Sequence, residues 1–369
     1  MLKKPLAFLL LAILGVFPHL AYAADKVLIV VSGHGTADHQ QPGYEFDEFS
    51  LAYEIFRDNG LDIDVASPAG GSVVADKFDS KKPYNTRVLA DQQAMAKLAR
   101  TLGTAKVVPA DYRAVYVVGG KGAMFDLPID KSLQTLIAQI YQDQGVVSAV
   151  CHGPAALVDV RLKDGRYLVA GHRVSAYTNE EERFFSKGLQ DTYPFMLEDR
   201  LGERGAVFDG TLLMLPHVSV SGRLITGQNP FSTALVAEAV VRALGKRPVA
   251  RVPEAEERSM TLLSRVANGD LAWAKDELAQ RPAAYQMPLI GAWGYYASMA
   301  AVERKDIQRA ATVMELASPY TQEPKLQLAL AKAYARLGEN TRAHALLTRL
   351  VKEEPDMQEA RELLSNLKG

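Results

Sequence analysis

Cysteine is almost absent from this sequence, since Cys151 is the only one among 369 residues. A chain with one cysteine forms no internal disulfide, so its hydrophobic core must supply its stability. Neither sign of charge dominates, because 42 Lys and Arg residues stand against 43 Asp and Glu residues. No long block of one sign occurs, which argues against a surface for nucleic acid or an anionic membrane.

Metal and phosphate signatures are also missing. The sequence has no HExxH motif, and its glycines do not match a P-loop. His34 and His39 lie in a glycine-rich loop. A metal pair is one interpretation, and a binding loop is the one we favour because no further ligands cluster there. His172 and His217 are expected to be surface or hydrogen-bonded histidines. We therefore predict no metal ion and no cofactor.

Only one apolar run is long, and it lies at the start of the chain. Residues 6–17 form 12 mostly apolar positions, fewer than the roughly 20 that a membrane-spanning helix needs. Two lysines precede this run, and Ala21 and Ala23 follow it as a small-x-small cleavage pattern. We expect residues 1–23 to be a signal peptide and the mature protein to begin at Ala24. The predicted location is the periplasm or the exterior, without stable membrane insertion; the alternative is an uncleaved anchor.

Strand-like and helix-like segments alternate through the first half of the mature chain. The predicted strands are 26–31, 61–66, 114–118 and 146–150, and the clearest predicted helices are 46–59 and 132–143. This order predicts right-handed β-α-β units and a mostly parallel sheet. Ligands of such sheets gather outside the carboxyl ends of the strands.

Cys151 follows one of these strand ends, in the sequence AVCHGPAAL. A lone cysteine is commonly a buried core residue, which is one interpretation. The other is a nucleophile, lifted out of the packing by a tight turn between strand and helix. A helix that begins here would stabilise the reactive thiolate through its dipole. The small residues around Cys151 favour the nucleophile.

Ala149–Pro154 resembles the nucleophile elbow of the ThiJ/PfpI family, relatives of the class I glutamine amidotransferases. Three further stretches resemble its heat-shock chaperone and glyoxalase III branch; they lie at residues 45–50, 118–128, and 177–182 together with 222–230. The similarity covers about residues 26–245. It implies a flavodoxin-like α/β fold, a three-layer sandwich around a mostly parallel sheet.

The resemblance also implies the site residues. Cys151 would be the nucleophile and His152 its general acid and base, with Glu182 orienting the imidazole. Glu48 would lie against the thiol, so that the two groups titrate as a coupled unit. The backbone N–H groups of Gly120 and His152 are the candidate oxyanion hole.

Two features weaken the assignment of these family roles to residues of this chain. Where the branch has a histidine after the glycine pair, this chain has Lys121, so a substrate contact of that histidine is in doubt. Taken without the resemblance, Glu48 reads as an exposed helix residue. Glu182 then belongs to a solvated face or a helix start, because Glu180 and Glu181 precede it.

A proline-containing stretch, residues 245–254, separates a tail of different composition. From Ala255 onward the pattern is helical, and residues 324–355 carry the small and aromatic positions of a tetratricopeptide repeat. Residues 293–319 resemble a degenerate copy, and residues 269–282 the end of another. A plain helical bundle is the alternative. We predict an α/β domain over residues 24–247 and a repeat-like helical domain over residues 248–369.

Two function classes follow. The first is an exported glyoxalase III-type hydro-lyase, in which Cys151 acts on 2-oxoaldehydes such as methylglyoxal to give 2-hydroxy acids without added cofactor. Peptidase or amidase activity also stays open. The second is an interaction protein, with the helical repeats binding a protein partner and the first domain acting as a holdase chaperone or redox sensor through Cys151. A homodimer is compatible with either class.

Overall fold

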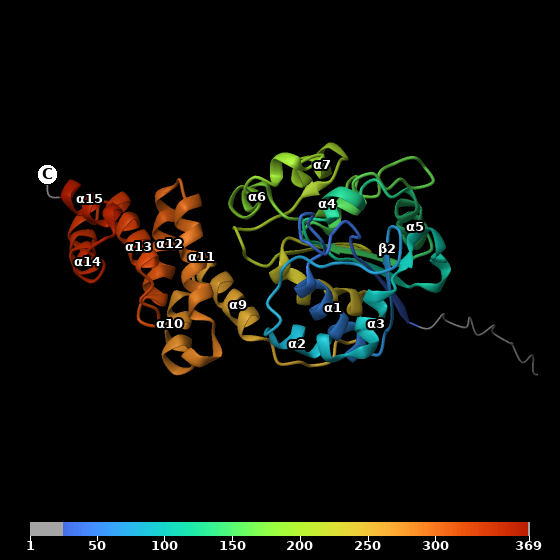
Figure 1. Cartoon of the computed structure of the whole chain (residues 1–369), viewed down its shortest axis with the longest axis horizontal. Coiled ribbons are helices and arrows are strands. Elements are labelled where there is room, and N and C mark those ends of the chain that lie inside the picture. Colours follow the sequence, from blue (N-terminus) through green and yellow to red (C-terminus); the bar gives the residue numbers. More distant parts are fainter. Residues whose placement is uncertain (1–24, 368–369) are drawn as a thin grey trace, which may run out of the picture.

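A seven-stranded sheet forms the centre of the first region of the computed structural model, which describes residues 25–367 (Figure 1). The strand order is β3-β2-β1-β4-β5-β9-β8, and only β8 runs antiparallel to its neighbour. The strands are β1 (Lys26–Val30), β2 (Asp62–Ser67), β3 (Leu102–Gly103), β4 (Ala114–Val117), β5 (Val146–Val150), β8 (Val218–Ser221) and β9 (Leu224–Gly227). A separate two-stranded sheet joins β6 (Arg173–Val174) and β7 (Val207–Phe208).

Helices cover both faces of the large sheet, which makes the three-layer sandwich expected from the sequence. One face packs on α1 (Phe46–Asp58), α2 (Pro83–Ala90), α3 (Gln92–Ala99) and α8 (Thr233–Ala243). The other packs on α4 (Ala123–Asp126), α5 (Lys131–Gln142), the 3₁₀ segment η3 (Gly153–Leu157) and α7 (Leu197–Glu203). Successive residues of β1 point to opposite cores, Val27 and Ile29 to one and Leu28 and Val30 to the other. Because both cores need apolar residues, the strands read as continuous apolar runs.

The predicted elements of the first region are confirmed, with ends that shift by about one residue. The flavodoxin-like fold and the mostly parallel sheet are therefore correct. The predicted signal peptide, residues 1–23, lies outside the described residues. No helix within residues 25–367 has the length and apolar character to cross a membrane.

The tail is all-helical, as its composition predicts. It consists of α9 (Ala255–Ala267), α10 (Leu271–Gln280), α11 (Met287–Ala300), α12 (Arg304–Ala317), α13 (Pro324–Leu337), α14 (Asn340–Glu353) and α15 (Gln358–Asn366). The predicted repeat at residues 324–355 corresponds to α13 and α14. Gly338 ends α13 with a φ of 77°, a left-handed conformation that glycine adopts without strain. Figure 1 shows these helices stacked away from the sheet.

The two regions share a hydrophobic core at their junction. Leu213, Met214 and Leu215 of the first region lie in one cluster with buried residues of α9 and α11. Nearer the connecting segment, Glu256 accepts hydrogen bonds from Lys82 Nζ (2.9 Å) and Tyr84 Oη (3.0 Å). The tail is thus packed against the α/β region rather than only tethered to it. The boundary between residues 247 and 248 stays a prediction.

Candidate active site

Cys151 lies in a strained turn directly after β5. Its φ is 60°, a left-handed value that is uncommon for a residue with a side chain. The turn is held on both sides, because the Cys151 N–H donates to the Gly227 carbonyl and the Tyr177 N–H donates to the Cys151 carbonyl, each at 2.9 Å. Gly153 permits the turn, since a Cβ there would lie 2.4 Å from the Val117 carbonyl oxygen. Strain of this kind is commonly found at functional sites.

The expectation that a helix dipole activates the thiol is not met. The turn leads into the five-residue 3₁₀ segment η3, with Pro154 in its first turn, and not into an α-helix. Cys151 is also only 3% exposed, so the turn does not lift it clear of the packing. Burial, and then the neighbouring Glu48 carboxylate, raise the pKa of the Cys151 thiol.

Glu48 belongs to α1 and is fully buried beside Cys151, so the alternative of an exposed helix residue is wrong. Its Oε2 atom accepts a 2.6 Å hydrogen bond from the Gly119 N–H. Burial, and then the charge of Glu45, raise the pKa of Glu48 well above its ordinary value, and the hydrogen bonds from the Gly119 N–H and the Cys151 thiol do not compensate. Gly119 must lack a side chain, because a Cβ would lie 2.8 Å from both Cys151 Cβ and Glu48 Oε2.

His152 bridges the thiol and a second glutamate. Its Nδ1 atom lies 3.3 Å from Cys151 Sγ, and its Nε2 atom lies 2.7 Å from Glu182 Oε1. The imidazole is 2% exposed and packs against the Tyr177 ring, with 4.5 Å between ring centroids. A histidine held at both nitrogens has a defined orientation, as a general acid and base requires.

Glu182 projects from the short helix α6 (Asn179–Phe185). The Thr178 side chain caps α6 in a capping box with Glu181. Burial opposes the ionisation of Glu182, but the hydrogen bond and charge of His152, with smaller help from Lys121, lower the pKa of Glu182 below its ordinary value. The helix-start interpretation is therefore right, and the solvated-face interpretation is wrong for both buried glutamates, Glu181 and Glu182.

Gly120 lies beside the thiol, and its neighbour Lys121 reaches the helix that carries Glu182. Gly120 has a φ of 91°, and its N–H points at the Cys151 sulfur, where it favours the thiolate. The Lys121 Nζ donates to the Phe185 carbonyl at the end of α6, at 3.0 Å. The lysine that replaces the family histidine thus holds the helix that carries Glu182. The predicted oxyanion role of the Gly120 and His152 amides stays a prediction.

The four histidines singled out from the sequence lie outside this cluster. His34 stacks on Phe125, with ring centroids 4.6 Å apart, and His39 lies in an exposed turn. His172 Nδ1 lies 2.9 Å from Ser221 Oγ, and His217 pairs with Asp209. Within residues 25–367, no three His, Cys, Asp or Glu side chains are arranged to hold a metal ion.

Some residues at the site carry no clear sequence signal. Tyr193 places its ring 6.0 Å from the His152 ring, from a loop between α6 and α7. Glu181 accepts hydrogen bonds from Met214 N, Gln228 and Asn229, which explains the GQNP motif near β9 as a brace for α6. The run of three glutamates was the available signal, but it does not show which member is buried where.

Comparison with known proteins agrees with this geometry. The family model described as DJ-1/PfpI matches residues 39–243, and a tetratricopeptide-repeat model matches residues 324–367. A glutathione-independent glyoxalase of Schizosaccharomyces pombe, hsp3101, is 32% identical over 240 residues, which are 59% of this chain and 95% of the relative.

Solved structures give the same result. Rapid Encystment Protein 24 KDa of Francisella tularensis superposes with a TM-score of 0.57 at 30% identity, over 60% of this chain and 99% of that one. Glyoxalase III of Candida albicans superposes with a TM-score of 0.55 at 25% identity, over 60% and 98% of the two chains. With its fold, its Cys-His turn and these matches, the chain belongs to the DJ-1/PfpI family.

Proposed function

We propose that the protein is a glutathione-independent glyoxalase that converts 2-oxoaldehydes such as methylglyoxal to 2-hydroxy acids. The observation that carries this proposal is the buried set of Cys151, His152, Glu48 and Glu182, with His152 held between thiol and carboxylate. The named activity of the relatives in S. pombe and C. albicans supports it.

In the proposed reaction Cys151 is the nucleophile. Its sulfur bonds to C1 of the aldehyde, and the thiol proton moves through His152 to the carbonyl oxygen, which gives a hemithioacetal. The backbone N–H groups of Gly120 and His152 stabilise the charge that develops on that oxygen. This step needs no metal or cofactor.

Glu48 then moves the carbon-bound proton. A carboxylate whose pKa is raised is a stronger base than an ordinary glutamate, so Glu48 is suited to remove the C1 proton. Return of a proton to C2 gives the thioester of a 2-hydroxy acid. Water then breaks the C–S bond, which releases the acid and restores the thiol, so the net change is addition of one water.

The alternative chemistry in this fold is amide or peptide hydrolysis. Assays of the purified chain with methylglyoxal, glutamine and a protein substrate in parallel distinguish glyoxalase activity from amide or peptide hydrolysis. The proposal expects turnover of the aldehyde alone, lost in Cys151→Ala. Cysteine-dependent release of ammonia or peptides, without aldehyde turnover, would assign the protein to the other class.

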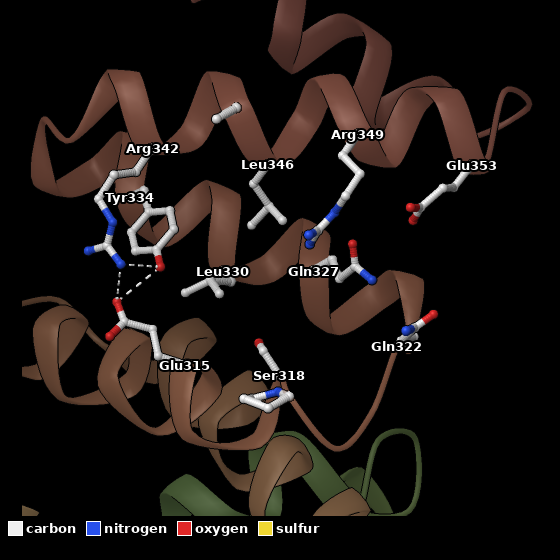
Figure 2. A pocket seen from close by; sticks show the side chains of 12 residues that line it. Glu315, Ser318, Gln322, Gln327, Leu330, Tyr334, Arg342, Leu346, Arg349 and Glu353 are labelled. Atoms are coloured by element: carbon white, nitrogen blue, oxygen red, sulfur yellow. Dashed lines mark hydrogen bonds and ion pairs between the residues drawn. The ribbon is translucent and has the colours of Figure 1, made fainter.

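We further propose that the helical tail binds a protein segment, because a cavity of about 540 Å³ lies between α12, α13 and α14. At one end Arg342 contacts Glu315 and the Tyr334 hydroxyl, and further along Arg349 points into the cavity (Figure 2). No carboxylate within residues 25–367 pairs with Arg349. Gln327 lines the same cavity, is 8% exposed, and its Oε1 atom has no partner in the described chain.

These free groups suit a segment that offers a carboxylate to Arg349 and polar groups to Gln327. The test is a peptide array probed with the full chain. Binding that is lost in Arg349→Ala, and kept in Lys332→Ala, whose side chain pairs with Glu359 outside the cavity lining, would support the proposal. Equal binding by both variants would contradict it.

We also propose that the protein is exported to the periplasm or secreted. The support is the sequence of residues 1–23, with two early lysines, a short apolar run and small residues at 21 and 23. Mass spectrometry of the native protein tests this, and a product that begins at Ala24 is expected. An intact Met1 on a membrane-bound product would contradict it.

A further inference from the structure

Helix α11 of the tail turns two aromatic side chains toward the α/β region. Trp293 and Tyr296 are three residues apart, so they lie on the same face of the helix. Trp293 is 1% exposed although it belongs to the appended helices. Both side chains contact segments that lead to the candidate active site.

Trp293 holds the loop before β8. Its indole Nε1–H donates to the Leu213 carbonyl at 2.9 Å, in a buried hydrogen bond. The next residue, Met214, has a φ of 62°, and its N–H donates to Glu181 Oε1 at 3.0 Å. A left-handed conformation at a residue with a side chain persists only where its surroundings impose it. The Trp293 bond therefore helps to fix the amide that holds Glu181.

Tyr296 contacts the C-terminal end of α6, the helix that carries Glu181. Its ring meets the Phe185 ring edge-on, with 4.9 Å between centroids, and the Phe184 ring at 6.2 Å. Phe185 is the last residue of α6, and its carbonyl accepts the Lys121 Nζ. The tail and Lys121 thus meet at one residue.

Helix α6 spans only seven residues, fewer than two turns, and so short a helix depends on tertiary contacts for its position. It carries Glu182, whose Oε1 lies 2.7 Å from His152 Nε2. We propose that Trp293 and Tyr296 are positioning residues, which set the orientation of His152 through α6. The tail would then be part of the enzyme as well as a binding module. This inference rests on the proposed glyoxalase function.

The test uses conservative variants of the full chain. Trp293→Phe removes the N–H but keeps a ring, and Tyr296→Ala removes the ring, whereas Tyr296→Phe keeps it. We expect kcat to fall about tenfold in the first two, because a displaced catalytic group costs rate more than binding. KM should change little, and Tyr296→Phe should match the parent. The matched control is Trp273→Phe, since Trp273 stacks on Arg265 within the tail.

Two readouts separate positioning from general destabilisation. Glu182→Gln already removes the carboxylate that α6 supplies to His152. Adding Trp293→Phe to this variant should therefore lower kcat little further. The proton NMR signal of the His152 hydrogen bond, assigned by its loss in Glu182→Gln, should weaken in Trp293→Phe and Tyr296→Ala.

The NMR signal also distinguishes this inference from the proposed function. If the parent turns over no aldehyde, a weakened signal in the two variants still supports the positioning role. An unchanged signal, or kcat losses equal to those of Trp273→Phe or additive with Glu182→Gln, would overturn it. Where Tyr296→Ala does not fold, Tyr296→Leu replaces it with the same expectation.

Discussion

Glu182 Oε1 lies 2.7 Å from His152 Nε2, with both side chains almost entirely buried. The hydrogen bond fixes the plane of the imidazole, and the other ring nitrogen then lies 3.3 Å from the Cys151 sulfur. The arrangement joins three segments distant in sequence: α1 with Glu48, the turn after β5, and α6. Predictions about each group follow from this relationship.

Cys151→Ala should abolish aldehyde turnover while leaving the fold intact, because alanine fits wherever cysteine does. Circular dichroism checks the fold. The parent should also react with iodoacetamide without denaturant, but slowly, because the thiol is 3% exposed and its pKa is raised. Since Cys151 is the only thiol, the extent of labelling reports this residue alone. A thiol that reacts only after unfolding, in a protein whose Cys151→Ala variant is fully active, would make this turn a structural feature only.

Glu48→Gln should stop turnover at a later step than Cys151→Ala does. The amide keeps the shape of the side chain but removes the base for the C1 proton, so the thiol still adds to the aldehyde. Mass spectrometry should find a hemithioacetal on Cys151 after trapping. Normal turnover by Glu48→Gln would show that another group moves the proton.

The two glutamates should affect stability with opposite signs as pH changes. The pKa of Glu48 is raised above its ordinary value of 4.5, so the parent loses stability relative to Glu48→Gln as pH rises through 4.5. The pKa of Glu182 is lowered, so its contribution is present above 4.5 and is lost as pH falls through the folded-state pKa.

Urea unfolding of the parent and both variants between about pH 3 and pH 8 measures this difference. From low to high pH, Glu48→Gln should gain stability relative to the parent, and Glu182→Gln should lose it. Glu180→Gln, from the same run of glutamates, is the matched control. Parallel curves for Glu48→Gln and Glu182→Gln would contradict the assigned environments.

Lys121→Met should shift the acidic limb of the kcat/KM profile to higher pH. The lysine charge is one of the groups that favour ionised Glu182, and its removal raises the pKa of that carboxyl. The effect should shrink at high ionic strength if the charge acts through solvent. An unchanged profile would limit Lys121 to its bond with the Phe185 carbonyl.

Much of the fold could be predicted because buried parallel strands leave a plain signal. β5 has the predicted bounds, α1 ends one residue earlier than predicted, and α5 begins and ends one residue earlier. The adjacent Cys151 and His152 could also be found, since a strand end followed by small residues marks a functional turn.

The rest depends on tertiary contacts that no local pattern encodes. Glu181 and Glu182 are neighbours of the same type, yet one braces α6 and the other meets His152, because successive helix positions point about 100° apart. The bond from Trp293 to Leu213 joins residues 80 positions apart. The 3₁₀ segment after Cys151 reflects the packing of Gly153 on β4, and it removes the helix dipole that the sequence suggests.

Methylglyoxal and lactate can be followed together by NMR with the purified chain and no glutathione, which decides whether Cys151 is the nucleophile of a glyoxalase. The parent should convert the aldehyde to an equal amount of lactate, and the folded Cys151→Ala protein should form none. Absence of lactate with the folded parent, or the same rate in Cys151→Ala, would contradict the proposed function.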